Sequence, residues 1–144
     1  MHYPIWKIEH IRHQIEVVNG TKAPDILIKN ATYLHSHLKK WISGNIWIVK
    51  DRIVYSGSET PLITDETEVY DAAGQKIVPG YIEPHVHPFQ LYNPQTFADY
   101  ASQLGTTTFI SDNLILFLML ENKKAFSIMD ELKKLPFSFY WWAR

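Results

Sequence analysis

The feature that most constrains the fold is a change in hydrophobic pattern at Pro79-Gly80. Before this point, apolar residues alternate with polar ones over short segments rich in β-branched and aromatic side chains, which is typical of strands. After it, strand-like and helix-like segments alternate, which is typical of parallel βα units. The sequence therefore predicts two domains, residues 1–79 and residues 80–144, within an α/β fold.

Residues 1–79 are predicted to form a helix followed by a small β domain. Apolar residues recur every three or four positions over Pro4–Asn19, and Gly20 is a natural helix stop. The predicted buried stripe consists of Ile5, Ile8, Ile11, Ile15 and Val18. Short strand-like segments separated by turn residues then fill Asp25–Pro79, and they indicate a small antiparallel sheet or sandwich.

Residues 80–144 are predicted to run strand, helix, strand, helix, strand. The strands are expected at Tyr81–His87, Thr106–Ser111 and Phe137–Trp142. Asn93 and Pro94 suit the N-cap and first position of a helix, and Gly105 suits its end. The expected inner face of this helix is Phe97, Tyr100, Ala101 and Leu104. A second helix is expected within Leu114–Leu135.

Length and composition exclude several classes of protein. A chain of 144 residues is too short for a complete (β/α)₈ barrel, which needs roughly 250. Three parallel strands that end in Trp141-Trp142 would leave an open edge and exposed apolar surface, so the sequence looks interrupted. The absence of cysteine excludes disulfides and thiolate metal sites, and it fits a cytoplasmic protein.

Charge and hydropathy argue against two kinds of partner. The formal net charge is -1, from 14 Lys+Arg and 15 Asp+Glu, so we expect no binding to nucleic acid or to an anionic membrane. The longest apolar run, Leu114–Leu120, is far shorter than the ~20 residues that cross a bilayer, and the N-terminus shows no signal peptide. We expect a small-molecule substrate, and the sequence leaves a homo-oligomer open.

The sharpest chemical feature is the pair His85 and His87 at the end of the first parallel strand. Side chains two residues apart on a strand point the same way, so the two imidazoles can converge on one metal ion. The C-terminal ends of parallel strands carry the active site in barrels and doubly wound sheets. The spacing and the position favour a metal site and a pair of hydrogen-bonded histidines equally.

A second histidine pair and two carboxylates are further candidates for chemistry. A second His-x-His, His35 and His37, lies in polar sequence between two strands and is predicted to be a surface loop. Asp112 ends the second parallel strand, where it can be a metal ligand, the partner of an imidazole or, as we favour, a helix cap. Glu83 shares the face of His85 and can orient a ligand or form a buried ion pair.

These residues together resemble the amidohydrolase superfamily. The segment 79–87, Pro-Gly-Tyr-Ile-Glu-Pro-His-Val-His, looks like the first barrel strand of that superfamily. The segments 25–31 and 44–57 resemble the small β-sandwich that precedes its barrel. Residues 94–105, the three threonines 106–108 and the N-terminal helix are similar to adenine deaminases in particular.

The resemblance implies a metal-dependent hydrolase acting on C–N bonds, in purine metabolism. It makes His85 and His87 ligands of a divalent metal ion, Mn, Fe or Zn, with Glu83 and Asp112 as further ligands or supporting residues. The metal makes hydroxide available near neutral pH, the hydroxide attacks the ring carbon that bears the amino group, and ammonia leaves. Adenine and water would thus give hypoxanthine and ammonia.

Three departures from the adenine deaminase pattern keep alternatives open. Adenine deaminases follow the threonine strand with Asp-Pro-His-Glu, whereas residues 112–115 here are Asp-Asn-Leu-Ile. Glu83 stands where the family usually has Asp. The catalytic acid and the remaining ligands are expected beyond Arg144, so we predict a fragment of an incomplete barrel with little or no turnover. The alternatives are a cyclic-amide amidohydrolase and a non-catalytic interaction module.

Overall fold

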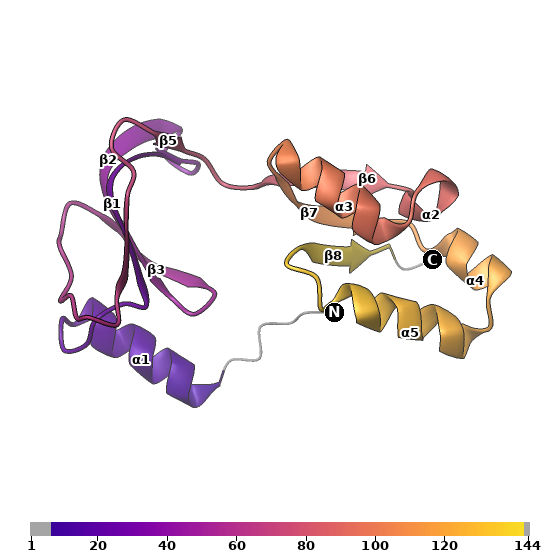
Figure 1. Cartoon of the computed structure of the whole chain (residues 1–144), viewed down its shortest axis with the longest axis horizontal. Helices are drawn as coiled ribbons and strands as arrows, with labels where there is room; N and C mark the ends of the chain where they lie inside the picture. The colour runs from indigo at the N-terminus through magenta and orange to yellow at the C-terminus, as the bar shows by residue number, and fades with distance from the viewer. Residues whose placement is uncertain (1–6, 143–144) are drawn as a thin grey trace. The chain divides into compact units, whose positions relative to one another are not determined.

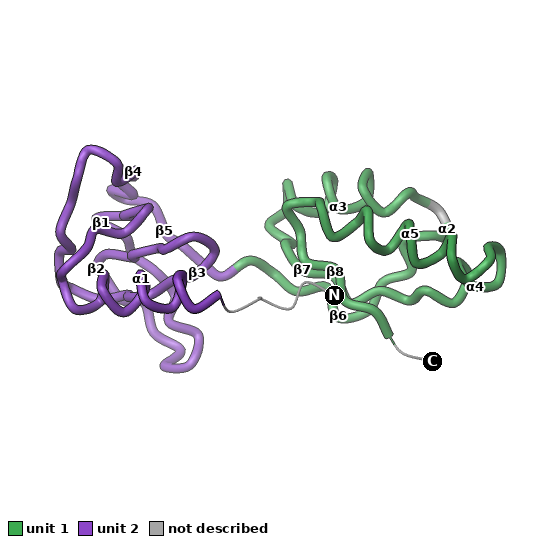
Figure 2. The backbone as a smooth tube through the Cα atoms, turned by 90° about the horizontal axis from the view of Figure 1, so that it is seen from below, with its two compact units in different colours: residues 1–4, 80–144 green, residues 5–79 purple. Residues whose placement is uncertain are grey.

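The protein's structure, a computed structural model, describes residues 7–142, apart from the side chain of Leu91. The chain divides into an N-terminal unit, Ile5–Pro79, and a C-terminal unit, Gly80–Arg144 (Figure 1, Figure 2). Each unit has its own sheet and its own apolar core. Among the described residues, no helix is long and apolar enough to cross a membrane.

Helix α1, Ile8–Val18, packs on the sheet of the N-terminal unit through Val17. Val17 is fully buried and shares a core cluster with Leu27, Trp47 and Val49. The predicted stripe is wrong in part, because Ile8, Ile15 and Val18 are exposed, and Ile5 lies outside the described residues. The helix carries apolar residues on more than one side, and the sheet covers the side that bears Val17.

The N-terminal unit is built on one mixed sheet, in the order β3-β2-β1-β4 with β5 also paired to β1. The strands are β1 (Ile26–His35), β2 (Lys40–Val49), β3 (Arg52–Gly57), β4 (Glu68–Asp71) and β5 (Lys76–Ile77). The first three are antiparallel neighbours, but β4 and β5 run parallel to β1. The all-antiparallel expectation is therefore wrong for β4 and β5, since the segment after β3 returns the chain to the start of β1.

A bulge in β1 is linked by a side-chain hydrogen bond to the neighbouring strand β4. The pairing of β1 with β2 shifts register between Ile28 and Ala31, and Asn30 there has a φ of 55°, which asparagine tolerates better than most residues. The Asn30 side-chain amide donates to both carboxylate oxygens of Asp71, at 3.0 and 3.1 Å. This hydrogen bond, together with those from the Ala73 amide and Lys29, holds the pKa of the Asp71 carboxyl below its ordinary value.

The C-terminal unit is a parallel three-stranded sheet in the order β6-β7-β8. Its elements are β6 (Tyr81–Val86), α2 (Pro88–Leu91), α3 (Pro94–Gln103), β7 (Thr106–Ser111), α4 (Leu114–Met119), α5 (Asn122–Leu132) and β8 (Ser138–Trp141). Figure 2 shows α3 and α5 on the same side of the strands, as right-handed crossovers along a sequential strand order require. The alternation of strands and helices that the sequence predicted is thus observed.

Phe109 forms the centre of the C-terminal core. It is fully buried against Ala98 of α3 and Leu132 of α5, and its ring stacks on Phe139 with 5.1 Å between centroids. Burying one such ring stabilises the fold by about 1.5–3 kcal/mol. This core fixes the level at which β6, β7 and β8 end, and so it positions the residues that follow them.

The helices predicted for this unit are observed, with two corrections. Asn93 caps α3 as expected, because its side chain accepts a hydrogen bond from the Thr96 amide at 2.9 Å. The expected inner face is wrong at two positions, since Tyr100 and Leu104 are exposed and Ala98 is buried instead. The single helix expected within 114–135 is two helices, separated where Leu120 takes an extended conformation.

Candidate metal centre

His85 and His87 lie at the C-terminal end of β6, as predicted. His85 is in the strand, and His87 follows it as the residue before α2, with φ -115° and ψ 70°. Both side chains are exposed. Pro88, fully buried at the first position of α2, fixes the direction of the chain directly after His87.

The two imidazoles converge through their outer nitrogens. Nε2 of His85 lies 3.0 Å from Nε2 of His87, and the ring centroids are 4.9 Å apart. Two metal–nitrogen bonds of about 2.0–2.1 Å that meet at roughly 90–110° place the nitrogens about 2.9–3.4 Å apart. The observed separation fits a hydrogen bond between the two rings and also fits two ligands of one metal ion. Imidazole suits Zn and Fe among divalent metals.

Asp112 supports His87 from the neighbouring strand. It is 8% exposed, and its Oδ2 lies 3.3 Å from Nδ1 of His87. The other oxygen accepts a hydrogen bond from the Leu114 amide at 2.7 Å, and the Asp112 amide donates to Val86 O at 2.9 Å. A carboxylate on Nδ1 leaves Nε2 of the same ring available to a metal. Asp112 thus contacts an imidazole and closes the turn before α4. The favoured prediction that it caps the helix is wrong, because the N-cap of α4 is Asn113.

Glu83 contacts the backbone of this site. Its Oε1 accepts a hydrogen bond from the amide of His85 at 3.1 Å. The carboxylate therefore holds the strand segment that carries His85. Among the residues that the structure describes, no group of three or more His, Cys, Asp or Glu side chains is gathered to hold a metal. The described part of the chain brings two histidines and two carboxylates together at this end of the sheet.

The sequence reasoning missed one neighbour of this site, Trp142. Its indole lies against the His85 imidazole, with 5.0 Å between ring centroids and 47° between ring planes. The sequence reasoning treated Trp141 and Trp142 together as apolar surface at an open edge. Alternation along a strand, which sends these two side chains to opposite faces, is the signal that could have separated them.

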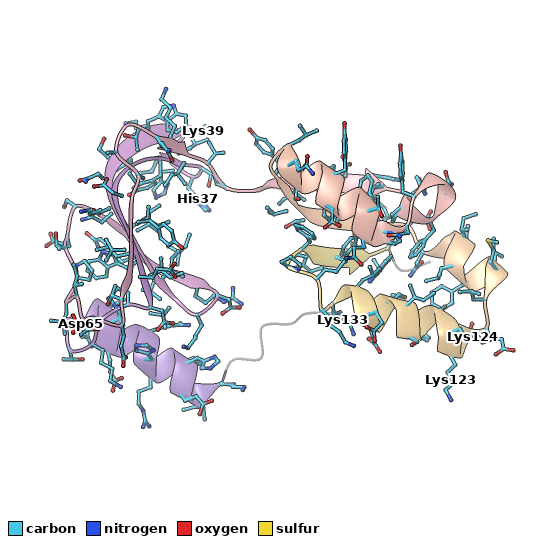
Figure 3. All side chains as sticks on the ribbon, viewed as in Figure 1. His37, Lys39, Asp65, Lys123, Lys124 and Lys133 are labelled. Carbon is cyan, nitrogen blue, oxygen red and sulfur yellow. The ribbon has the colours of Figure 1, made fainter. Side chains whose placement is uncertain are left out.

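The other histidines that the structure describes do not form a comparable site. The predicted surface loop is confirmed for His37, which lies exposed in the turn after β1, where Figure 3 shows it with Lys39. The prediction is wrong for His35, which is the half-buried last residue of β1. His35 and His37 have ring centroids 6.1 Å apart in an edge-to-face arrangement. On α1, His13 lies with Nε2 3.3 Å from Ala23 O, a contact that anchors the end of the helix.

Comparison with known proteins gives a consistent set of relatives. No family model matches the chain. A protein of Oceanobacillus iheyensis and one of Bacillus subtilis, both named "Putative adenine deaminase", are each 52% identical over 139 residues. Each match covers 96% of this chain and 24% of the relative. A protein of Thermosipho africanus named adenine deaminase is 36% identical over 99 residues, which cover 68% of this chain and 17% of the relative.

A solved structure supports the same relationship. The D-hydantoinase (dihydropyrimidinase) of Thermus sp. matches with a TM-score of 0.55 and 25% identity, over 74% of this chain and 24% of that one. The chain thus spans about a quarter of the length of the proteins it matches. By sequence and by fold, it belongs with the adenine deaminase-like proteins of the amidohydrolase superfamily and corresponds to their N-terminal part.

Proposed function

We propose that this chain is part of a metal-dependent amidohydrolase that converts adenine and water to hypoxanthine and ammonia. The observation that carries the proposal is the convergence of the His85 and His87 Nε2 atoms to 3.0 Å, with Asp112 at Nδ1 of His87. The names of the relatives support a purine base as substrate. The resemblance of segment 79–87 to the first strand of amidohydrolase barrels supports the reaction class.

The proposal includes an architecture. Residues 80–144 would be the first βα units of a (β/α)₈ barrel, and residues 1–79 a helix and small β-sandwich domain. Support comes from the sequential parallel strands with their helices on one side, and from the likeness to the hydantoinase. His85 and Asp112 then stand at the C-terminal ends of the first two barrel strands, where barrel enzymes carry their active sites.

Each residue of the site has a separate task in this scheme. His85 and His87 would bind a divalent Mn, Fe or Zn ion, which supplies the Lewis acidity that activates water. Asp112 would hold the His87 ring with Nε2 directed outward, and Glu83 would hold the backbone of His85. A catalytic zinc site usually takes three protein ligands. The remaining ligand and the catalytic acid would come from residues beyond Arg144 in a longer protein.

A second candidate function is hydrolysis of a cyclic amide. Two observations favour it. Leu114 and Ile115, which begin α4 next to Asp112, stand where adenine deaminases carry His-Glu. The solved structure that the chain resembles is named a hydantoinase. Apolar side chains at this point would remove two groups that could bind a metal or move a proton, so the substrate would have to be recognised differently.

A chimera tests the function in a chain of full length. The matching segment of the Bacillus subtilis relative would be replaced by this chain, and ammonia release from adenine measured with added Mn²⁺ or Zn²⁺. We expect the chimera to be active and the 144-residue chain alone to show little or no turnover. His85→Ala or His87→Ala should lower the chimera's rate at least about 100-fold, since each removes a metal ligand.

The controls separate the two candidate functions. The unaltered relative is the positive control, and His35→Ala in the chimera is the matched histidine control. Ring opening of a hydantoin, in place of ammonia release, would favour the cyclic-amide alternative. A chimera that keeps full activity with His85→Ala would overturn the proposed metal site.

A further inference from the structure

We propose that Trp142 is a positioning residue for His85, and that its indole keeps the His85 imidazole turned so that Nε2 faces His87. The proposal rests on the proposed metal site and adds a residue that the sequence pattern did not indicate. It follows from the contact between the indole and the imidazole, 5.0 Å between centroids, on the side of the sheet where the candidate site lies.

The backbone of Trp142 is fixed by the sheet. Its amide donates to Ser111 O at 3.0 Å, which extends the pairing of β7 and β8 by one residue. The preceding Trp141 packs the other way, with its ring stacked on those of Phe89 and Phe139. Successive strand residues point to opposite faces, so the core that holds Trp141 also directs Trp142 to the other face, where its indole meets the His85 ring.

The two histidines are therefore held in different ways. Nδ1 of His87 has a carboxylate 3.3 Å away, from Asp112. For His85, the backbone amide donates to Glu83 Oε1, and this hydrogen bond does not limit rotation of the ring about its side-chain bonds. The ring itself contacts Nε2 of His87 at 3.0 Å and the indole of Trp142. The ring contact with Trp142 restricts that rotation, and so it lowers the ordering cost that a metal ion would otherwise meet.

A purely structural role for Trp142 predicts an effect of substitution on stability and none on metal affinity. The side chain is 42% exposed, so it contributes less to the core than a buried aromatic residue does. A structural residue would change stability when substituted and leave the metal affinity of the folded protein unchanged. A positioning residue changes the metal affinity, and a second aromatic side chain restores it.

The test uses two substitutions and a control in the 144-residue chain. Trp142→Leu keeps an apolar side chain without a ring, and Trp142→Phe keeps a ring. Trp41→Leu is the control, because Trp41 is similarly exposed, at 47%, in the N-terminal unit. Zn²⁺ alone is titrated by calorimetry, with folding checked by circular dichroism. We expect Trp142→Leu to weaken Zn²⁺ binding about 2- to 10-fold, and Phe to restore most of it.

Proton NMR of the metal-free protein gives an independent readout. The ring current of Trp142 should shift the His85 ring protons upfield, and Trp142→Leu should remove that shift. Unshifted His85 protons in the wild type, or a folded Trp142→Leu variant with unchanged affinity, would overturn the positioning role alone. If the wild type binds no Zn²⁺ through His85 and His87, both the metal site and the positioning role are wrong.

Discussion

The chain contains two His-x-His pairs, and their surroundings differ. His35 and His37 have ring centroids 6.1 Å apart, at the end of β1 and in an exposed turn. The Leu38 amide donates to Nδ1 of His35 at 3.3 Å, which is a contact of the turn itself. His85 and His87 have centroids 4.9 Å apart, with Nε2 atoms at 3.0 Å.

The difference shows that spacing alone does not make a site. The pair at the end of β6 lies beside two parallel strands whose own ends bring a carboxylate and an indole to the imidazoles. The pair at the end of β1 leads into a turn of an antiparallel hairpin, and the Leu38 amide that donates to His35 belongs to that turn. Convergent contacts from separate strands are what distinguish the candidate centre.

The largest expected effect comes from removing one histidine of each pair. His85→Ala or His87→Ala should weaken Zn²⁺ binding by the 144-residue chain at least about 100-fold, because each deletes a direct ligand. His35→Ala and His37→Ala should leave the Zn²⁺ affinity unchanged. Equilibrium dialysis at neutral pH measures all four variants. Equal losses of Zn²⁺ affinity from the two pairs would show that His85 and His87 bind Zn²⁺ no better than His35 and His37.

A smaller effect is expected from the carboxylate that supports His87. Asp112→Asn keeps an oxygen that can accept the Leu114 amide, so the turn before α4 should persist. It removes the negative charge at Nδ1 of His87, and we expect Zn²⁺ affinity to fall about 10- to 100-fold. Asp99→Asn, at an exposed position on α3, is the matched control. An unchanged affinity in the Asp112 variant would show that the contact between Asp112 and His87 contributes nothing to metal binding.

Much of the C-terminal unit could be predicted from the sequence because its signals are local. The bounds of β7 agree with the predicted Thr106–Ser111, and Asn93 caps α3 as its position indicated. The break between α4 and α5 was missed, because neither Gly nor Pro marks it. The prediction of which side of α1 meets the sheet was wrong. Periodicity reveals an apolar stripe, but it cannot choose between two such stripes on one helix.

The site was predictable in position and less so in contacts. The rule that parallel strands end at one edge placed His85, His87 and Asp112 together. The sequence pattern could not predict which residue contacts each imidazole, because those contacts depend on the strand order β6-β7-β8. Trp142 follows the strand two places away from β6, about 10 Å across the sheet, and its large indole bridges part of that span to the His85 ring.

The smallest expected effect concerns a carboxylate with no part in the candidate site. Hydrogen bonds from Asn30 and the Ala73 amide lower the pKa of Asp71. Its ionised form should therefore stabilise the fold fully above the unfolded pKa of about 3.9, and this stabilisation should be lost as the pH falls through the lower folded pKa. Urea unfolding should show Asp71→Asn less stable than wild type at pH 7, with a difference that shrinks on acidification.

Zn²⁺ affinity separates Asp71 from Asp112. Asp71→Asn should bind Zn²⁺ as the wild type does, because Asp71 contacts residues of the N-terminal unit alone in the hydrogen bonds and ion pair that the structure shows for it. Asp65→Asn, at an exposed position before β4, is the control for the loss of one surface charge (Figure 3). A stability difference that stays constant with pH would mean that the Asn30 contact does not depend on the ionised carboxylate.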